Sequence, residues 1–592
     1  MKKLIAYCFS LCCALHAYPQ YFLRGTVHDE KNIALQSAKI YLHSSKAQFR
    51  SGNDGSFGIS CNTLYDSITV SQDGYEPLTL RVKTDVWQNL LLKLSADAVF
   101  RNRPKLISFT KDRRSSARHN PFVSDETYFK LVENDYVKAD QYPNTGFSLN
   151  VNKAAYSNVR RFINQESRVP PDAVRIEELL NYFNLGYDPP QGNNTFKVRT
   201  DLASCPWNSK ERLLFLNVSA RKLDLDKKPP GNFVFLIDVS GSMDMANRLG
   251  LLKAAFQLFI KNLRPIDKIS IVTYGGTVGT WLPPTSGSEQ KQISNAIELL
   301  TAAGDTPGSE AIQAAYKLAR NSFIPGGNNR VIIATDGDFN VGQVSEKELD
   351  ELITKERQSG VYLTCLGVGM GNFKDSKLQT LAKRGNGNYA YLDDLHEAEK
   401  VLVYELTETL YAVADDAYIN VTFDPAKVSN YRLVGFDNKK EAVQDESSDL
   451  DGGEIGSGSS TMAVFQIMPA EGVEFTDSTS GNLGILNLKY TDAADSLNHE
   501  QEISVPIPAR MKNDPDSCTR FATAVVMYGM KLRESPYLNK ASWIDVKNAA
   551  EVSADKNNYL QNDFLTLVNK TIAIYAPGKG KKGRRKERDK EL

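Results

Sequence analysis

Residue types that build zinc sites and disulfide frameworks are scarce in this sequence. Among 592 residues there are only seven cysteines and six histidines. Three cysteines fall near the N-terminus, and the other four, Cys61, Cys205, Cys365 and Cys518, are far apart with no C-x-x-C pair. This spacing argues against a zinc or disulfide framework. The histidines are also scattered, and His396-Glu397 lacks the second histidine that a zinc protease helix requires.

The sequence also lacks a net charge and a long apolar run. Lys plus Arg and Asp plus Glu each total 71, so the global charge does not indicate a nucleic-acid partner. The apolar stretch from Leu4 to Ala17 has 14 residues, too few to span a bilayer. It follows Lys2 and Lys3, which predicts a signal peptide over residues 1–17, either cleaved near Ala17 or lipidated. We therefore expect an exported protein of the periplasm or the cell surface and outer envelope, without a transmembrane segment.

The length predicts several domains with substantial cores. Residues 21–94 contain short alternating runs separated by polar turns, which is typical of a small antiparallel β-sandwich. Residues 95–119 are basic without a sustained period and indicate a linker. Residues 577–592 form a basic, glycine-containing tail. Peripheral contact of this tail with an anionic envelope surface is an alternative to a simple solvated end.

One short segment carries the clearest functional signal. Phe233 to Ile237 is apolar without alternation, as in a strand buried on both faces of a parallel sheet. Asp238, Ser240 and Ser242 follow directly, where the carboxyl end of such a strand exposes its ligand crevice. A carboxylate and two hydroxyls suit Mg²⁺, which prefers oxygen ligands. The alternative interpretation is a serine-rich helix cap that follows a buried strand.

This segment resembles the D-x-S-x-S metal-ion-dependent adhesion site (MIDAS) of von Willebrand factor type A (VWA) domains. In that family a Thr and a second Asp from later loops complete the site. The matching residues are Thr306, in Ala-Gly-Asp-Thr-Pro-Gly, and Asp336, in Ala-Thr-Asp-Gly. The resemblance implies a metal site made of Asp238, Ser240, Ser242, Thr306 and Asp336. It would hold Mg²⁺, with Mn²⁺ or Ca²⁺ as alternatives.

The flanking regions also carry resemblances. Gly25-Thr-Val27 and the turn from Gly52 to Phe57 are similar to the carboxypeptidase regulatory-like domain of exported bacterial proteins. Phe147 to Asn152 and Val174 to Phe183 resemble the N-terminal region of a bacterial family of exported VWA proteins. We expect that region at residues 120–230, the VWA domain with its metal site at residues 231–412, and a C-terminal family region of strands and then helices at residues 413–576.

The expected architecture is multidomain. A small N-terminal β-sandwich precedes an α/β, doubly wound, Rossmann-like VWA domain with β-sandwich and helical flanking regions. Strand-like runs stand before the VWA domain, at residues 196–218, and after it, at residues 418–507. Because exposed strand edges are normally paired or covered, we predict that both sets share one sandwich into which the VWA domain is inserted.

The function we expect is binding rather than catalysis. A VWA domain of this type implies an exported adhesion or protein-binding module, in which Mg²⁺ bridges to an Asp or Glu side chain of a partner protein. A metal-dependent hydrolase is one alternative, since a metal held by oxygen ligands can activate water. A structural protein of cell-envelope assembly is another.

Overall fold

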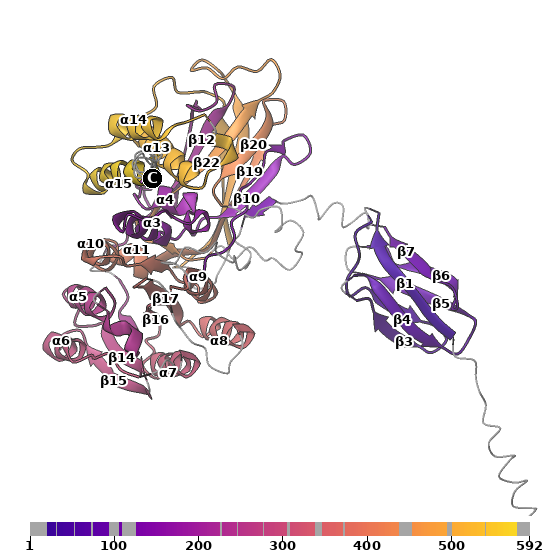
Figure 1. Ribbon diagram of the computed structural model, residues 1–592, viewed down its shortest axis with the longest axis horizontal. Helices are drawn as coiled ribbons and strands as arrows, with labels where there is room; N and C mark the ends of the chain where they lie inside the picture. Colours follow the sequence, from indigo (N-terminus) through magenta and orange to yellow (C-terminus); the bar gives the residue numbers. More distant parts are fainter. Residues whose placement is uncertain are drawn as a thin grey trace, which may run out of the picture. The chain divides into compact units, whose positions relative to one another are not determined.

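The computed structural model describes residues 21–30, 32–52, 54–72, 75–93, 106–108, 126–224, 228–245, 247–275, 277–304, 308–337, 346–370, 373–436, 453–493, 500–538 and 540–576. The chain divides into two compact units, Met1–Pro104 and Lys105–Leu592 (Figure 1). The predicted signal peptide and the basic tail lie outside the described residues. Within the described ranges, no helix combines the length and the hydropathy needed to cross a membrane.

The N-terminal unit is a β-sandwich, as the sequence predicted, but it is not antiparallel throughout, because β1 pairs in parallel with β7. One sheet has the order β4-β1-β7 and the other the order β3-β2-β5-β6. Alternate side chains of each strand point inward, such as Ile40 and Leu42 of β2, and they form one apolar core. The strands are β1 (Tyr21–Asp29), β2 (Lys39–Leu42), β3 (Ala47–Arg50), β4 (Ser56–Cys61), β5 (Tyr65–Ser71), β6 (Leu78–Lys83) and β7 (Gln88–Leu92).

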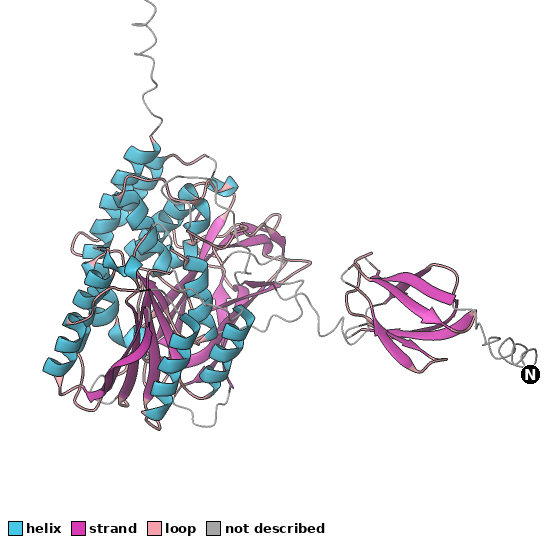
Figure 2. Cartoon of the chain, turned by 60° about the horizontal axis from the view of Figure 1, so that its bottom comes forward, coloured by secondary structure: helices cyan, strands magenta, loops and turns pink. Residues whose placement is uncertain are grey.

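The centre of the second unit is an α/β domain whose sheet has the order β15-β14-β13-β16-β17-β18. Figure 2 shows helices on both sides of this sheet. Its strands are β13 (Gly231–Asp238), β14 (Lys268–Gly275), β15 (Thr277–Ser286), β16 (Asn328–Thr335), β17 (Tyr362–Gly367) and β18 (Tyr389–Tyr391). Its helices are η3 (Gly241–Asp244), α5 (Leu249–Ile260), α6 (Gln290–Glu298), α7 (Gly308–Asn321), α8 (Glu346–Gln358), α9 (Asp375–Arg384), α10 (Leu395–Glu399), η4 (Lys400–Tyr404) and α11 (Leu406–Leu410).

The sheet of this domain is parallel except at one edge. Strand β15 pairs antiparallel with β14, with register irregularities near Ile271. Its sequence contains Pro283 and Pro284, and proline is compatible with a strand only at an edge or a bulge because it lacks the N–H donor. The two prolines are therefore consistent with the position of β15 at the border of the sheet.

Strand β13 is buried along its whole length because helices cover both faces of the sheet. Phe235 and Ile237 lie in a core cluster with residues of α5 and α6. Val234 and Leu236 point to the opposite face and join residues of α7, α8 and α9. This explains why the strand is continuously apolar. The parallel neighbours β14 and β16 pair with β13 on either side, so the carboxyl ends of all three strands lie at one edge.

A second β-sandwich flanks the α/β domain. One sheet has the order β11-β12-β22-β20-β9, and the other has the order β24-β23-β19-β10-β8, with β21 paired to β19. Apolar side chains of both sheets share one core. The strands are β8 (Leu106–Ser108), β9 (Val137–Lys138), β10 (Asn144–Ser148), β11 (Phe196–Ser204), β12 (Arg212–Ala220), β19 (Ala412–Phe423), β20 (Val428–Val434), β21 (Ile455–Gly456), β22 (Ser460–Pro469), β23 (Asn482–Asp492) and β24 (Glu500–Pro508).

This sandwich confirms that the α/β domain is an insertion. Strand β12, which precedes the domain, pairs antiparallel with β22, which follows it, from Arg212 opposite Ile467 to Ser219 opposite Ser460. Strand β10 likewise pairs with β19 across the domain.

One expectation, the extent of the basic linker, needs correction. Residues 95–119 are not linker throughout, because β8 pairs in parallel with β10 and so belongs to the sandwich.

A helical layer covers the outer face of the β11-β12-β22-β20 sheet (Figure 1). It combines helices from both sides of the insertion, and its core includes Phe183, Phe521 and Phe564, whose rings contact each other edge-on. The helices are α3 (Ala154–Asn164), η1 (Pro171–Ala173), α4 (Ile176–Asn181), α13 (Ser517–Leu532), η5 (Pro536–Leu538), α14 (Trp543–Ser553) and α15 (Tyr559–Tyr575). The predicted helical regions are thus confirmed, with a break at Ala554 between α14 and α15.

Buried ion pairs connect the α/β domain to these flanking layers. Arg175, before α4, contacts Asp375 of α9 at 2.7 Å, and both side chains are almost completely buried. Arg330 of β16 contacts Glu454 at 2.7 Å, again in a buried position. Such pairs need good geometry, because the desolvation of two charges is costly. They fix the inserted domain in one orientation on its support.

Candidate metal centre

Asp238 is the last residue of β13, and its side chain is completely buried. Its Oδ1 accepts a hydrogen bond from the backbone N–H of Ser240 at 2.9 Å. Its Oδ2 accepts from the hydroxyl of Thr335 at 2.9 Å and from that of Tyr274 at 3.2 Å. Tyr274 and Thr335 lie at the carboxyl ends of β14 and β16, the two neighbours of β13. The three strand ends therefore converge on one carboxylate, whose orientation is fixed.

Ser240 and Ser242 lie on the short loop after Asp238, with their hydroxyl oxygens 3.1 Å apart. Ser240 is buried and Ser242 is partly exposed. The loop is held against a second loop, because Gly241 N–H donates to the carbonyl of Gly304 at 3.0 Å and Ala303 N–H donates to that of Val239 at 2.6 Å. Gly304 is the last described residue of this second loop. Thr306 itself lies outside the described residues.

Asp336 follows β16 directly and is also completely buried. The next residue is Gly337, with φ of +86°, and a Cβ there would lie 2.6 Å from the backbone nitrogen of Lys374. Only glycine fits this turn without strain. Asp336 forms a buried ion pair with Arg248, which the sequence patterns did not indicate. The structure thus brings Asp238, Ser240, Ser242 and Asp336 to one edge of the sheet.

The Asp238 carboxyl at this edge has an unusually high pKa for an aspartate. Burial raises the pKa of the Asp238 carboxyl to about 6, and the nearby charge of Asp336 adds to the rise. Hydrogen bonds from Ser240 and Thr335 oppose it. A raised pKa means that the ionised carboxylate is destabilised by its surroundings, and a bound cation offsets this destabilisation. A positive ion at this position would therefore stabilise the folded site.

The donor set fits a hard divalent cation. Two aspartates and two serine hydroxyls offer only oxygen atoms, as Mg²⁺ and Mn²⁺ prefer. Among the described residues no group of three or more His, Cys, Asp or Glu side chains gathers as metal ligands. A site with few charged ligands leaves positions on the ion for water or for an incoming carboxylate. Asp238, Ser240, Ser242 and Asp336 would hold the ion, and the ion would attract an anionic group.

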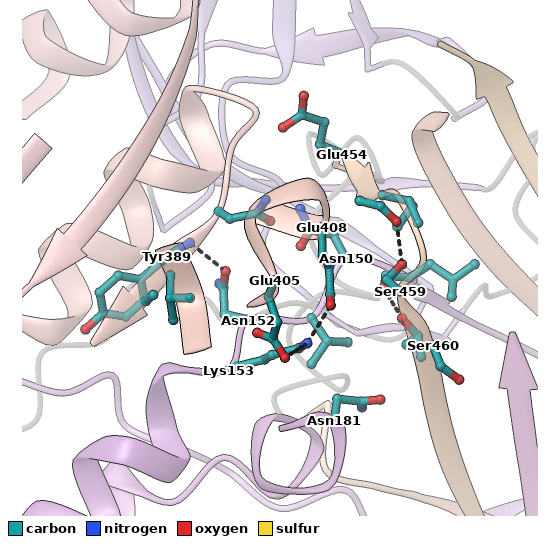
Figure 3. A pocket seen from close by; sticks show the side chains of 18 of the residues that line it. Asn150, Asn152, Lys153, Asn181, Tyr389, Glu405, Glu408, Glu454, Ser459 and Ser460 are labelled. Atoms are coloured by element: carbon teal, nitrogen blue, oxygen red, sulfur yellow. Dashed lines mark hydrogen bonds and ion pairs between the residues drawn. The ribbon is translucent and has the colours of Figure 1, made fainter. Parts of the chain in front are cut away.

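A separate cavity of about 70 Å³, with several charged and amide side chains in its lining, lies where the α/β domain meets its flanks (Figure 3). It is lined by Asn150 and Lys153 from the N-terminal side and by Glu405 and Glu408 from the end of the α/β domain. Lys153 contacts both glutamates, and Lys400 contacts Glu405 at 2.8 Å. Because lysines already neutralise these carboxylates, this cavity suits a cation less well than the Asp238 edge does.

Comparison with known proteins agrees with this architecture. Three family models match the chain: von Willebrand factor over residues 122–215, von Willebrand factor type A domain over residues 233–338, and Uncharacterized protein YfbK, C-terminal, over residues 408–574. Uncharacterized protein YfbK of Escherichia coli (strain K12) is 37% identical over 487 residues, which cover 78% of this chain and 84% of that protein.

More distant similarities are confined to parts of the chain. Inter-alpha-trypsin inhibitor heavy chain H2 of Mus musculus is 28% identical over 148 residues, which are 24% of this chain and 16% of that protein. The solved structure of von Willebrand factor type A from Catenulispora acidiphila aligns with a TM-score of 0.38 at 16% identity, covering 64% of this chain and 91% of that one.

Proposed function

This chain belongs to the YfbK family of von Willebrand factor type A proteins, and we propose that it is an exported, metal-ion-dependent module that binds an acidic side chain of a partner protein. A von Willebrand factor type A domain is typically a protein-binding module. The observation that carries the finer proposal is the convergence of Asp238, Ser240, Ser242 and Asp336 at the carboxyl edge of the sheet. Thr306, which follows Gly304 by two positions in the sequence, is proposed as the fifth ligand.

The proposed ion is Mg²⁺, with Mn²⁺ or Ca²⁺ as alternatives. Bound to oxygen ligands, it would supply a positive centre for an Asp or Glu of the partner. We do not propose catalysis. In the part of the chain that the structure describes, the groups that hydrogen-bond to Asp238 are the backbone N–H of Ser240 and the hydroxyls of Tyr274 and Thr335. Neither a histidine nor a lysine is among these groups to activate a serine.

Export to the periplasm or the cell surface is part of the proposal and is supported by the Lys2-Lys3 start and the apolar stretch that follows. Assignment of the N-terminal sandwich to the carboxypeptidase regulatory-like domains is supported by its two-sheet architecture. A role in cell-envelope assembly would be compatible with the same binding activity.

A pull-down from an envelope extract tests the proposal. Intact protein and the Asp238→Ala variant are each immobilised and washed in Mg²⁺ or in chelator. The proposal predicts partners retained only by the intact protein in Mg²⁺ and eluted by chelator. Asp244→Asn is a matched control, because Asp244 lies in the same loop with an exposed side chain. Retention that is equal for the intact and Asp238→Ala proteins would refute metal-dependent binding.

A further inference from the structure

A guanidinium group lies inside the candidate metal centre. Arg248 immediately precedes α5 and is almost completely buried. One of its terminal nitrogens contacts Asp336 and also donates to the backbone carbonyl of Ser242 at 2.9 Å. Its other terminal nitrogen donates to the carbonyl of Met370 at 2.8 Å. The positive charge is thus shared between the serine loop, the Asp336 turn and the loop after β17.

The surrounding backbone is shaped to accept this side chain. Gly369 has φ of +78°, and a Cβ at this position would lie 2.6 Å from Nε of Arg248 and 3.0 Å from its Cγ. The arginine therefore packs directly on glycine backbone. Since two of its hydrogen bonds go to backbone carbonyls, its position does not depend on Asp336 alone. We treat it as a fixed charge of the site rather than a mobile surface cation.

Arg248 alters the net charge of the candidate metal centre. Among the described residues of the site, Asp238 and Asp336 contribute two negative charges and Arg248 contributes one positive charge. Loss of Arg248 would therefore make the site more negative by one charge, both without an ion and with a divalent cation bound. Charges that are buried interact through a lower dielectric than charges in water and are less screened by salt. A change of one unit of charge next to the metal centre therefore alters the affinity of the site for both cations and anions.

We propose that Arg248 sets the anion preference of the metal centre: it lowers the affinity for the divalent cation and raises the affinity of the loaded site for a carboxylate. This inference rests on the proposed function and adds a residue that determines its specificity. By holding Asp336, the guanidinium also withdraws negative charge from the ion, which leaves the ion more attractive to the partner's acidic side chain.

Replacement of the charge tests the proposal. Mn²⁺ serves as the metal probe, with affinity measured by titration calorimetry. Acetate serves as the carboxylate probe and is titrated at constant ionic strength while the relaxation of water protons at bound Mn²⁺ is followed. For Arg248→Met we expect Mn²⁺ affinity at least tenfold higher and acetate affinity at least tenfold lower than in the intact protein. Arg248→Lys keeps the charge but loses the forked donor geometry, so both values should lie between those of Arg248→Met and those of the intact protein.

A second variant moves the guanidinium without changing any charge. Gly369→Ala places a methyl group against Arg248, so we expect both affinities to shift in the same directions as in Arg248→Met, by threefold or more. Gly326→Ala is the matched control, because Gly326 has a similar φ of +70° but nothing within 4 Å of the added Cβ. This control should leave both affinities unchanged. The Gly369 variant also carries the test if Arg248→Met does not fold.

The outcomes separate this inference from the proposed function. If the intact protein binds Mn²⁺ but the Met and Gly369 variants match it in both affinities, Arg248 does not tune the site and the inference is wrong. If both affinities fall together, Arg248 only maintains the fold of the site, which also contradicts it. If the intact protein binds no Mn²⁺ at all, the proposed function itself fails.

Discussion

The substitution Asp238→Asn should stabilise the metal-free protein at neutral pH. The change keeps the shape of the side chain and removes its charge. The remaining carbonyl oxygen can still accept from the N–H of Ser240. The new amide group would replace Oδ2, which accepts from the hydroxyls of Thr335 and Tyr274 in the intact protein, and it can donate to those two oxygens instead. Alanine would leave these groups without a partner, so asparagine isolates the effect of charge.

The magnitude follows from the pKa of Asp238. Its folded value of about 6 lies above the ordinary 3.8, so the folded state favours the neutral acid. Below pH 3.8 the carboxyl is neutral in both states and does not lower the free energy of unfolding. As the pH rises from 3.8 to about 6, the unfolded state ionises more readily than the folded state, and the free energy of unfolding falls. At 1.36 kcal/mol per pH unit the full loss is about 3 kcal/mol. At pH 7.5 in chelator, Asp238→Asn should recover up to about 3 kcal/mol, which is about 3 °C for a unit of this size. At pH 4 the gain should be close to zero.

Differential scanning calorimetry of the larger unit measures both effects. The intact protein should gain stability from Mg²⁺ at pH 7.5, and Asp238→Asn should gain almost none because it has lost the charged ligand. Asp244→Asn, in the same loop, should behave like the intact protein. The reasoning is refuted if Asp238→Asn is less stable than the intact protein in chelator at pH 7.5, or if its gain is the same at pH 4 and pH 7.5.

Three further predictions concern the support of the site. Arg175→Met should destabilise the larger unit by about 3–5 kcal/mol in urea denaturation, because Asp375 would keep a buried charge without its partner; a loss below 1 kcal/mol would contradict this. Gly275→Ala should weaken stabilisation by Mg²⁺, because its Cβ would lie 2.6 Å from the carbonyl oxygen of Val239 and 2.7 Å from that of Ala303, whereas Gly279→Ala, with open space around it, should not. Mg²⁺ at 100 times its Kd should increase the free energy of unfolding of the larger unit by about 2.7 kcal/mol. In calorimetry the transition of the larger unit should move to higher temperature, and that of the N-terminal sandwich should not move. A shift of both transitions would place the ion elsewhere.

The sequence predicted those parts of the molecule that depend on local pattern. The continuous apolar run before Asp238 indicated a strand covered on both faces, and β13 is such a strand. The argument from strand edges predicted the insertion, because an unpaired strand such as β12 needs a partner and finds it in β22. Asp336 was identified through the resemblance to VWA domains, and in the structure it and the serine loop contact the same arginine, Arg248.

What the sequence did not show depends on residues that meet only in three dimensions. Arg248 is 88 positions from Asp336, and a single arginine before a helix has no periodic signature. Tyr274 lies in β14 and contacts Asp238 only because two parallel strands end at the same level. Strand β8 was missed because three residues in a basic segment cannot show alternation.

Diffraction at the manganese absorption edge, from crystals grown in millimolar Mn²⁺, tests the central claim most directly. The account predicts an anomalous peak about 2.2 Å from a carboxylate oxygen of Asp238 and from the hydroxyl oxygens of Ser240 and Ser242, as expected for a small divalent ion with oxygen ligands. The peak should be absent from crystals of Asp238→Asn. A peak found only beside Glu405 and Glu408, or a peak of equal height in both proteins, would contradict it.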